Sequence, residues 1–240
     1  MITRREKTVF MVTVAVAIAV ILSLCASFGH GKNAGAATLE IKTFRLLNSG
    51  IINPALDRIM PLVTDFRRWK FFVIFVWSAL VLFGGTRGRW VALVLIVFIV
   101  SSDQLTSHLI KPLVSRTRPC DILGRVHLWY GSEGWITTPA HVTQSYKSSF
   151  SFPSGHSANI TPSMLFLGLV YRRFLVAFLT LAALVALSRI YIGVHWPLDV
   201  AAGVSIGAVL GWLAYIIYRM LPWVNQAETT EGISTKEQSR

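Results

Sequence analysis

The feature that most constrains the fold of this chain is a set of apolar segments. Six of them are present, at about residues 8–28, 69–85, 90–109, 157–171, 174–191 and 197–219. A helix that crosses a bilayer needs about 20 apolar residues, and backbone in lipid must pair internally, so such segments must be helical. Only 14% of the 240 residues are charged, whereas soluble domains carry about a quarter. We therefore predict an all-α fold, an integral membrane bundle of six transmembrane helices.

The connections between these segments differ in length and alternate between the two sides of the membrane. The second and third segments are joined by GGTRGR, and the fourth and fifth by YRR. The two long connections, about residues 30–68 and 110–156, then lie together on the opposite side. Both termini share the short-loop side. Residues 1–224 are expected to form one membrane domain, and the polar, aperiodic residues 225–240 a disordered tail.

The first long connection mixes apolar and charged residues at near-helical spacing. Its apolar positions are Leu39, Phe44, Leu47, Ile51 and Ile52, and its charged positions include Glu40, Lys42 and Arg45. This pattern is typical of an amphipathic interfacial segment that lies on the bilayer surface. The alternative is a cover that packs on the bundle without touching lipid.

The N-terminus begins MITRREK and continues into an apolar run of about 20 residues. Such a start is shared by signal peptides and by uncleaved signal anchors. Because the run is longer than the usual core of a signal peptide, we expect an anchor that remains as the first helix.

The net charge of +12 on so apolar a chain indicates anionic partners. These are lipid headgroups or a phosphorylated substrate. The basic residues form no single tract, which argues against nucleic acid. The two cysteines, Cys25 in an apolar segment and Cys120 in a loop, are not expected to pair. Cations flank the apolar segments on both sides of the membrane, so the positive-inside rule alone does not orient the chain. If the cations of the long-loop side serve the function instead, the remaining cations place the short loops in the cytoplasm.

Three polar clusters lie on the long-loop side. They are KPLVSRTRP from Lys111, FPSGHS from Phe152, and SRIYIGVHWPLD from Ser188. Each alone has an ordinary explanation, such as a snorkelling lysine, a helix cap, or an Arg189–Asp199 ion pair. Together they combine a single carboxylate, Asp199, with the four cations Lys111, Arg116, Arg118 and Arg189. These cations would repel one another unless an anion lay between them, and phosphate suits their donors.

The same clusters contain residues for phosphoryl transfer. Ser154 and Gly155 supply a hydroxyl and a close backbone N–H at a helix N-terminus, which favours an anion. His195 and Asp199 are one helical turn apart, so the carboxylate can orient the ring as a nucleophile towards phosphorus. His156 can protonate the leaving oxygen. No carboxylate cluster is left for Mg²⁺, and the histidines lack zinc spacing. We predict catalysis without a metal or cofactor, through a phosphohistidine.

The three clusters resemble the three-part signature of the type-2 phosphatidic acid phosphatase superfamily. The matching patterns are Lys111-x6-Arg118-Pro119, Pro153-Ser154-Gly155-His156 and Ser188-Arg189-x5-His195-x3-Asp199, without departure in residue or spacing. The resemblance implies a lipid phosphate or diphosphate phosphatase with His195 as nucleophile, Asp199 as its orienting partner and His156 as general acid. It also implies phosphate binding by Lys111, Arg118 and Arg189, assisted by Ser154 and Gly155. Similar bacterial members act in the inner membrane, with the site open to the periplasm.

Among substrates, undecaprenyl diphosphate or a related prenyl diphosphate is favoured by its frequency in the family. Phosphatidylglycerophosphate, phosphatidic acid and the phosphates of lipid A stay open. A phosphotransferase, in which an alcohol replaces water, is a variant of the same chemistry. A receptor for anionic lipid is the competing class, but simple binding would not require two histidines and a carboxylate.

Several residues outside the signature are also candidates. Arg116, two positions before Arg118, is expected to face away from the substrate. Asp103 and His108 make the end of the third segment polar, and we interpret them as support for neighbouring helices or for Lys111. The loop from Cys120 to Phe152 is long and aromatic, which indicates a lid or a headgroup-selecting wall; the alternative is an ordered cover that merely packs.

Overall fold

The computed structural model describes residues 34–221 and, before them, positions 8, 11, 12, 15 and 19. Most of the first apolar segment lies outside the described residues, as do Cys25 and the polar tail from residue 225. The expected signal anchor and the expected disordered tail therefore stay predictions.

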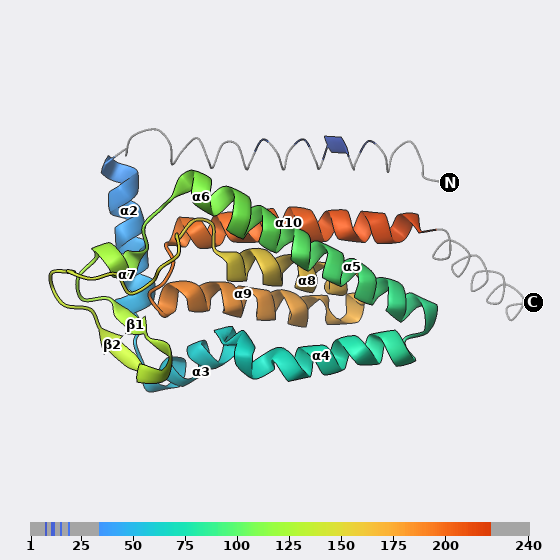
Figure 1. Ribbon diagram of the computed structural model, residues 1–240, viewed down its shortest axis with the longest axis horizontal. Helices are drawn as coiled ribbons and strands as arrows, with labels where there is room; N and C mark the ends of the chain where they lie inside the picture. The colour runs from blue at the N-terminus through green and yellow to red at the C-terminus, as the bar shows by residue number, and fades with distance from the viewer. Residues whose placement is uncertain (1–7, 9–10, 13–14, 16–18, 20–33, 222–240) are drawn as a thin grey trace, which may run out of the picture.

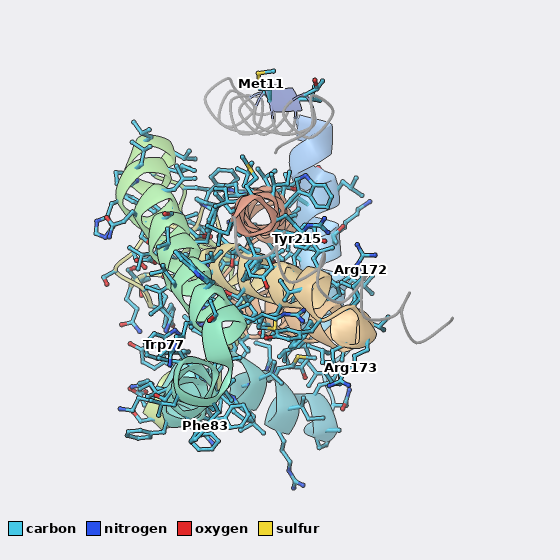
Figure 2. The ribbon with its side chains drawn as sticks, turned by 90° about the vertical axis from the view of Figure 1, so that its right-hand side faces the viewer. Met11, Trp77, Phe83, Arg172, Arg173 and Tyr215 are labelled. Atoms are coloured by element: carbon cyan, nitrogen blue, oxygen red, sulfur yellow. The ribbon has the colours of Figure 1, made fainter. Side chains whose placement is uncertain are left out.

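Five long helices run alongside one another down the longest axis of the molecule (Figure 1). In chain order they are α4 (Phe66–Phe83), α5 (Gly85–Asp103), α8 (Gly155–Val170), α9 (Leu175–Tyr191) and α10 (Pro197–Met220). The α4–α5 turn and the short 3-10 helix η4 (Arg172–Phe174) lie at one end of the bundle, which Figure 2 views directly, with Arg172 and Arg173 labelled. The protein is mostly helical, as predicted.

Three stretches of the described residues are long and apolar enough to cross a membrane. They are Gly85–Ile122, Arg172–Tyr191 and Pro197–Met220. Helix α8 has only 16 residues, and α4 begins with a cationic sequence, FRRWK. These helices fit an integral membrane protein.

Glycines bring α10 directly against α8. Gly203, Gly207 and Gly211 recur every fourth residue, so they share one face of α10. A Cβ on Gly203 would lie 2.5 Å from the Ser154 carbonyl oxygen, and one on Gly207 would lie 2.7 Å from Cβ of Thr161. Small residues at such spacing let helix backbones approach closely in membranes. This contact sets the N-terminus of α8 beside that of α10, where the Ser154 N–H donates to the Asp199 carbonyl at 3.0 Å.

The long connections fold into a cap at the other end of the bundle (Figure 1). The first gives α2 (Ala34–Arg45), a π-helical turn η1 (Leu46–Gly50) and α3 (Pro54–Thr64). The second gives the π-helical η2 (Gln104–Ile110), α6 (Lys111–Val114), α7 (Pro119–Ile122), β1 (His127–Trp129), the 3-10 turn η3 (Gly131–Glu133) and β2 (Trp135–Thr137). The strands pair antiparallel, with Leu128 opposite Ile136. Both long connections therefore lie together, as predicted from the loop lengths.

The first connection is not one amphipathic helix, because α3 starts afresh behind the cap of Asn53, whose side chain accepts from the N–H groups of Ala55 and Leu56. One side of it packs on the bundle: Phe44 is fully buried and lies 5.5 Å, ring to ring, from Trp196. The other side leaves apolar side chains exposed, among them Leu39, Leu46, Ile51, Ile52, Ile59 and Leu62. The predicted cover is present, and the exposed apolar side remains available to lipid.

Candidate active site

The three polar clusters meet at the capped end of the bundle. The Arg118 guanidinium, between α6 and α7, lies 3.2 Å from Nε2 of His195. His195 precedes α10, whose first turn is hydrogen bonded through Asp199 to the start of α8. The sequence placed these clusters on one side of the membrane, and the fold brings them into contact.

A tight turn presents His195. The turn requires Gly193, which has φ +82°, because a Cβ there would lie 2.7 Å from the His127 carbonyl oxygen. The Arg189 carbonyl then accepts from the N–H of His195 at 3.2 Å. The histidine ring is 2% exposed. A guanidinium only donates, so Nε2 accepts from Arg118 and the proton of a neutral ring lies on Nδ1, which faces Asp199.

The predicted contact between His195 and Asp199 is longer than a hydrogen bond. Nδ1 of His195 and Oδ2 of Asp199 are 3.6 Å apart, beyond the usual N–H···O range. Ser151, which the sequence did not single out, lies beside both: its hydroxyl donates to Oδ2 and is 3.5 Å from Nδ1. The N–H of Trp196 also donates to Oδ2, at 2.9 Å, as part of a capping box. Asp199 is thus an N-cap partner as well as the carboxylate nearest the histidine.

Arg116 binds two carboxylates and is not among the residues that line the cavity beside Arg189. Its Nη1 donates to Oδ1 of Asp199 at 2.7 Å and its Nη2 to Oε2 of Glu40 at 2.5 Å. The guanidinium lies over the Trp196 ring, 5.2 Å from its centroid. Glu40 also accepts from the Leu198 N–H at 3.3 Å. Its side chain, expected on a polar surface, is 9% exposed because it pairs with Arg116.

Arg118 does not present a free fork to a phosphate. Its Nε and Nη1 donate at 2.7 Å to the carbonyls of Ser149 and Val194. Its Nη2 donates to the Ser149 hydroxyl at 3.0 Å and the Phe150 carbonyl at 3.2 Å. With these partners the side chain is fixed and only 6% exposed. One donor remains directed at His195.

Arg189 is different, because part of it is unbonded. Its Nη1 donates to the Thr64 hydroxyl, at the end of α3, at 2.7 Å. Its buried Nε has no hydrogen-bond partner among the described residues. Arg189 and His156 both line a cavity of about 460 Å³. A cavity-lining guanidinium with a donor left unbonded is suited to an anionic ligand.

Lys111, Ser154 and Gly155 lie at the N-terminus of α8. A Cβ on Gly155 would lie 3.7 Å from Nζ of Lys111, so the ammonium faces the glycine backbone, and the first N–H groups of a helix have no partner within it. Ser154 caps the helix: its buried hydroxyl accepts from Ser157, at 3.4 Å from the N–H and 3.0 Å from the hydroxyl. The hydroxyl of Ser154 is therefore engaged locally, unlike the backbone beside it.

Asp103 and His108 are the two residues predicted to support neighbouring helices or Lys111. Asp103 does bond to the neighbouring helix α8. Oδ1 of Asp103 accepts from the Ser107 hydroxyl at 3.1 Å and from the Asn159 amide at 3.3 Å. The hydroxyl of Ser107 lies 4.0 Å from the position of a Cβ on Gly155, so it borders the same space as Lys111. His108 is exposed.

Electrostatics keep both histidines of the unliganded site neutral. Burial, and then the charges of Arg118 and Arg189, lower the pKa of His195 well below its usual range. The charge of Arg189, followed by burial, lowers the pKa of His156, which precedes the apolar segment 157–171, to about 2. A neutral His195 fits a nucleophile. Protonation of His156 requires an anion that offsets the charge of Arg189.

The second long connection forms an ordered wall. Its hairpin is held by Asp57, whose carboxylate lies 2.9 Å from Nε2 of His127 and accepts from the Tyr191 hydroxyl at 2.6 Å. The His127 ring stacks on Trp135 at 4.0 Å. Four residues of the stretch between Cys120 and Phe152 line the cavity: Trp129, Gly131, Ser132 and Lys147. The stretch therefore borders the cavity, and its role as a headgroup-selecting wall stays a prediction.

Within residues 34–221 and the few described positions before them, no group of three or more His, Cys, Asp or Glu residues could hold a metal ion. Cys120 is buried as a free thiol.

Comparison with known proteins agrees with this geometry. Residues 91–223, more than half of the chain, match the model of the PAP2 superfamily. The chain is 27% identical over 188 residues to a lipid A 4'-phosphatase of Porphyromonas gingivalis, covering 75% of this chain and 73% of that protein. It is 26% identical over 189 residues to an undecaprenyl-diphosphatase of Sulfolobus acidocaldarius, covering 78% and 80%.

A solved structure shares the fold. The transmembrane PAP2-type phosphatidylglycerolphosphate phosphatase of Bacillus subtilis superimposes with a TM-score of 0.59 at 24% identity, over 82% of this chain and 93% of the other. The chain therefore belongs to the PAP2 superfamily, the type-2 phosphatidic acid phosphatases.

Proposed function

We propose that this protein hydrolyses a lipid phosphate or diphosphate through a phosphohistidine on His195. The observation that carries the proposal is Arg189, which lines a cavity together with His156 and whose buried Nε has no hydrogen-bond partner among the described residues, next to a buried, neutral His195. A membrane lipid phosphatase is also what the family predicts for the chain.

The reaction follows from the direction of each donor. Phosphate oxygens accept from Arg189, from Lys111 and from the first N–H groups of α8, and they take the Arg118 donor that otherwise meets Nε2 of His195. Nε2 is then free to attack phosphorus. The P–N bond forms as the P–O bond to the lipid breaks, and His156 gives its proton to the leaving oxygen.

The second half returns the enzyme to its starting state. His156, now neutral, takes a proton from water, whose oxygen attacks phosphorus and breaks the P–N bond. Inorganic phosphate leaves. Asp199 and Ser151 stabilise the positive imidazole of the intermediate from the Nδ1 side. The phosphate itself supplies the negative charge that raises the pKa of His156 from its depressed value, so general acid and substrate arrive together.

Membrane placement is part of the proposal. Six transmembrane helices, the first of them before residue 34, put the cavity on the periplasmic side of the inner membrane. Arg172 and Arg173 at the short-loop end then lie in the cytoplasm, in agreement with the positive-inside tendency (Figure 2). The exposed apolar side of α2 and α3 would rest on the periplasmic lipid surface.

For the substrate we retain two candidates. Prenyl diphosphates are favoured by family frequency and by the similarity to an undecaprenyl-diphosphatase. Lipid A phosphates are favoured by the similarity to a lipid A 4'-phosphatase. Phosphatidylglycerophosphate, phosphatidic acid and transfer to an alcohol other than water are tested beside them.

The experiment is phosphate release by the full chain in detergent, with EDTA present, across these lipids. Release from at least one lipid, absent from His195→Ala, supports the proposal. Loss of activity with EDTA and recovery with Mg²⁺ would exclude the metal-independent route. Lipid binding without any release would favour a receptor, and release dependent on an added alcohol would favour a transferase.

A further inference from the structure

The cavity is larger than one phosphate requires. Its volume, about 460 Å³, lies within the range of about 300–1,000 Å³ typical of pockets for whole small molecules. Arg189 and His156 account for one part of its wall. The end of α3, the start of α4, the hairpin with its turn, the loop before α8 and the turn between α9 and α10 line the rest. The cavity can therefore hold more of a headgroup than the phosphate that reacts.

Three further cations line this cavity, and we refer to Arg67, Arg68 and Lys147 as the outer cations. None of them belongs to the family signature. Arg67 and Arg68 follow the cap of α4, and Lys147 comes from a loop about 80 positions later in the chain. Convergence from separate segments on one cavity distinguishes them from cations that merely extend from a helix end towards lipid headgroups.

The positive charge of the outer cations exceeds the negative charge of the carboxylate beside them. Nε of Arg67 and Nε of Arg68 share one carboxylate, Asp65, at 3.5 and 3.3 Å. The two guanidiniums are 84% and 59% exposed, so these contacts hold them weakly. Among the described residues Lys147 has no ion pair; its ammonium lies 5.5 Å from the centre of the Tyr130 ring. The three cations and Asp65 leave a net charge of about +2 beside the Arg189 site.

Other charges near Lys147 do not cancel this excess. The carboxylate that acts on it, Asp121, has a weaker effect than burial and the charges of Arg118 and Arg189, and it accepts from the Tyr146 N–H at 2.6 Å. Burial lowers the pKa of Lys147, as do the charges of Arg118 and Arg189. An anion in this part of the cavity would relieve both effects, whereas a neutral sugar or glycerol would not.

We infer that the outer cations bind a second phosphate group of the same substrate, so that the preferred headgroups carry two phosphates. The inference rests on the proposed function and narrows it. It fits a diphosphate, whose second phosphate is adjacent to the first, and a glycolipid with two separate phosphates. It disfavours lipids with a single phosphate, such as phosphatidic acid.

The test compares matched lipids in neutral detergent micelles. One pair is a disaccharide lipid with two phosphates and the same lipid with one; the other is a prenyl diphosphate and its monophosphate. The variants are Lys147→Gln and Arg67→Gln/Arg68→Gln, and the control is Arg172→Gln/Arg173→Gln at the other end of the bundle. We expect KM for at least one two-phosphate lipid to rise about tenfold in each variant, with kcat unchanged, since uniform binding is lost. KM for the one-phosphate lipids and for the control should change less than about twofold.

The outcomes separate the inference from the proposed function. Equal changes for both members of each pair, or none, overturn the inference while leaving the phosphatase intact. A change in the disaccharide pair alone assigns the outer cations to a distant phosphate, and a change in the prenyl pair alone to an adjacent one. If KM responds only when anionic lipid is added to the micelles, the outer cations bind the membrane surface and the inference is wrong.

Absence of any release from the wild type counts against the proposed function. In that event binding of the same lipid pairs, measured by native mass spectrometry, still decides the inference. A preference for two phosphates that disappears in Lys147→Gln supports it, and equal binding of both members by the wild type contradicts it.

Discussion

Two arginines of the site, Arg118 and Arg189, show how differently the same side chain can be used. Arg118 donates to three backbone carbonyls and a hydroxyl and is 6% exposed. Arg189 lines the cavity and donates to the Thr64 hydroxyl, and its buried Nε has no hydrogen-bond partner among the described residues. Arg118 is therefore part of the framework that orients His195, while Arg189 is prepared for a ligand. The family signature predicts phosphate binding for both arginines, and only their hydrogen bonds in the structure distinguish the two roles.

The largest expected effect is at the nucleophile that the framework holds. His195→Ala should lower kcat by about 10⁴-fold or more, since no other group can form the covalent intermediate. Phosphate release measures it, and trapping of acid-labile phosphoprotein from labelled substrate measures the intermediate. Wild-type turnover by this variant would remove the proposed mechanism.

Substitution of each arginine tests whether the two side chains have different roles. Arg189→Gln should lower kcat/KM by about 10²–10³-fold, as for other lost transition-state donors, while thermal unfolding changes little. Arg118→Gln should also lower activity, but it leaves buried carbonyls unpaired and should destabilise the fold by about 3 kcal/mol. Thermal unfolding in detergent separates them. Equal stability losses in the two variants would show that the distinction is false.

A smaller effect is expected at the residues behind Asp199. Arg116→Gln should lower kcat by about tenfold with KM unchanged, because Asp199 loses a charge-assisted hydrogen bond. Glu40→Gln, one contact farther away, should have an effect of about two- to threefold. Arg116→Lys should restore part of the rate by returning the charge. A change confined to KM would instead assign Arg116 to substrate binding.

The smallest effect concerns pH. The pKa of folded His195 is lowered, so below about 6.5 the unfolded chain binds a proton that the folded chain does not. Its contribution to stability is therefore complete above that pH and falls by up to about 1.4 kcal/mol for each pH unit below it. Thermal unfolding between pH 5 and 7.5 measures the slope, which should be shallower in His195→Ala. An identical slope in both proteins would assign the pH dependence to other groups.

Much of this site could be predicted from short-range patterns. The spacing of Lys111 and Arg118, the Pro-Ser-Gly-His sequence, and the four-residue separation of His195 and Asp199 all lie within single clusters. The partners that tune them come from elsewhere. Thr64 is 125 positions from Arg189, and Glu40 is 76 positions from Arg116. Ser151, next to Asp199, belongs to a loop whose sequence has no periodicity. Such contacts depend on how the helices pack, which no local spacing reports.

The sequence by itself determined that the chain is a helical membrane protein, that its long connections share one end, and which residues are candidates for phosphate chemistry. Apolar length, loop length and residue type are local properties, and the bilayer leaves few alternatives to helices. The tertiary structure alone decided which arginine donors are bonded within the protein and which have no partner among the described residues. Close packing of α10 on α8 through glycine brings the clusters together. The loops that cover them supply carbonyls that bond Arg118, while Arg189 keeps a donor for the proposed ligand.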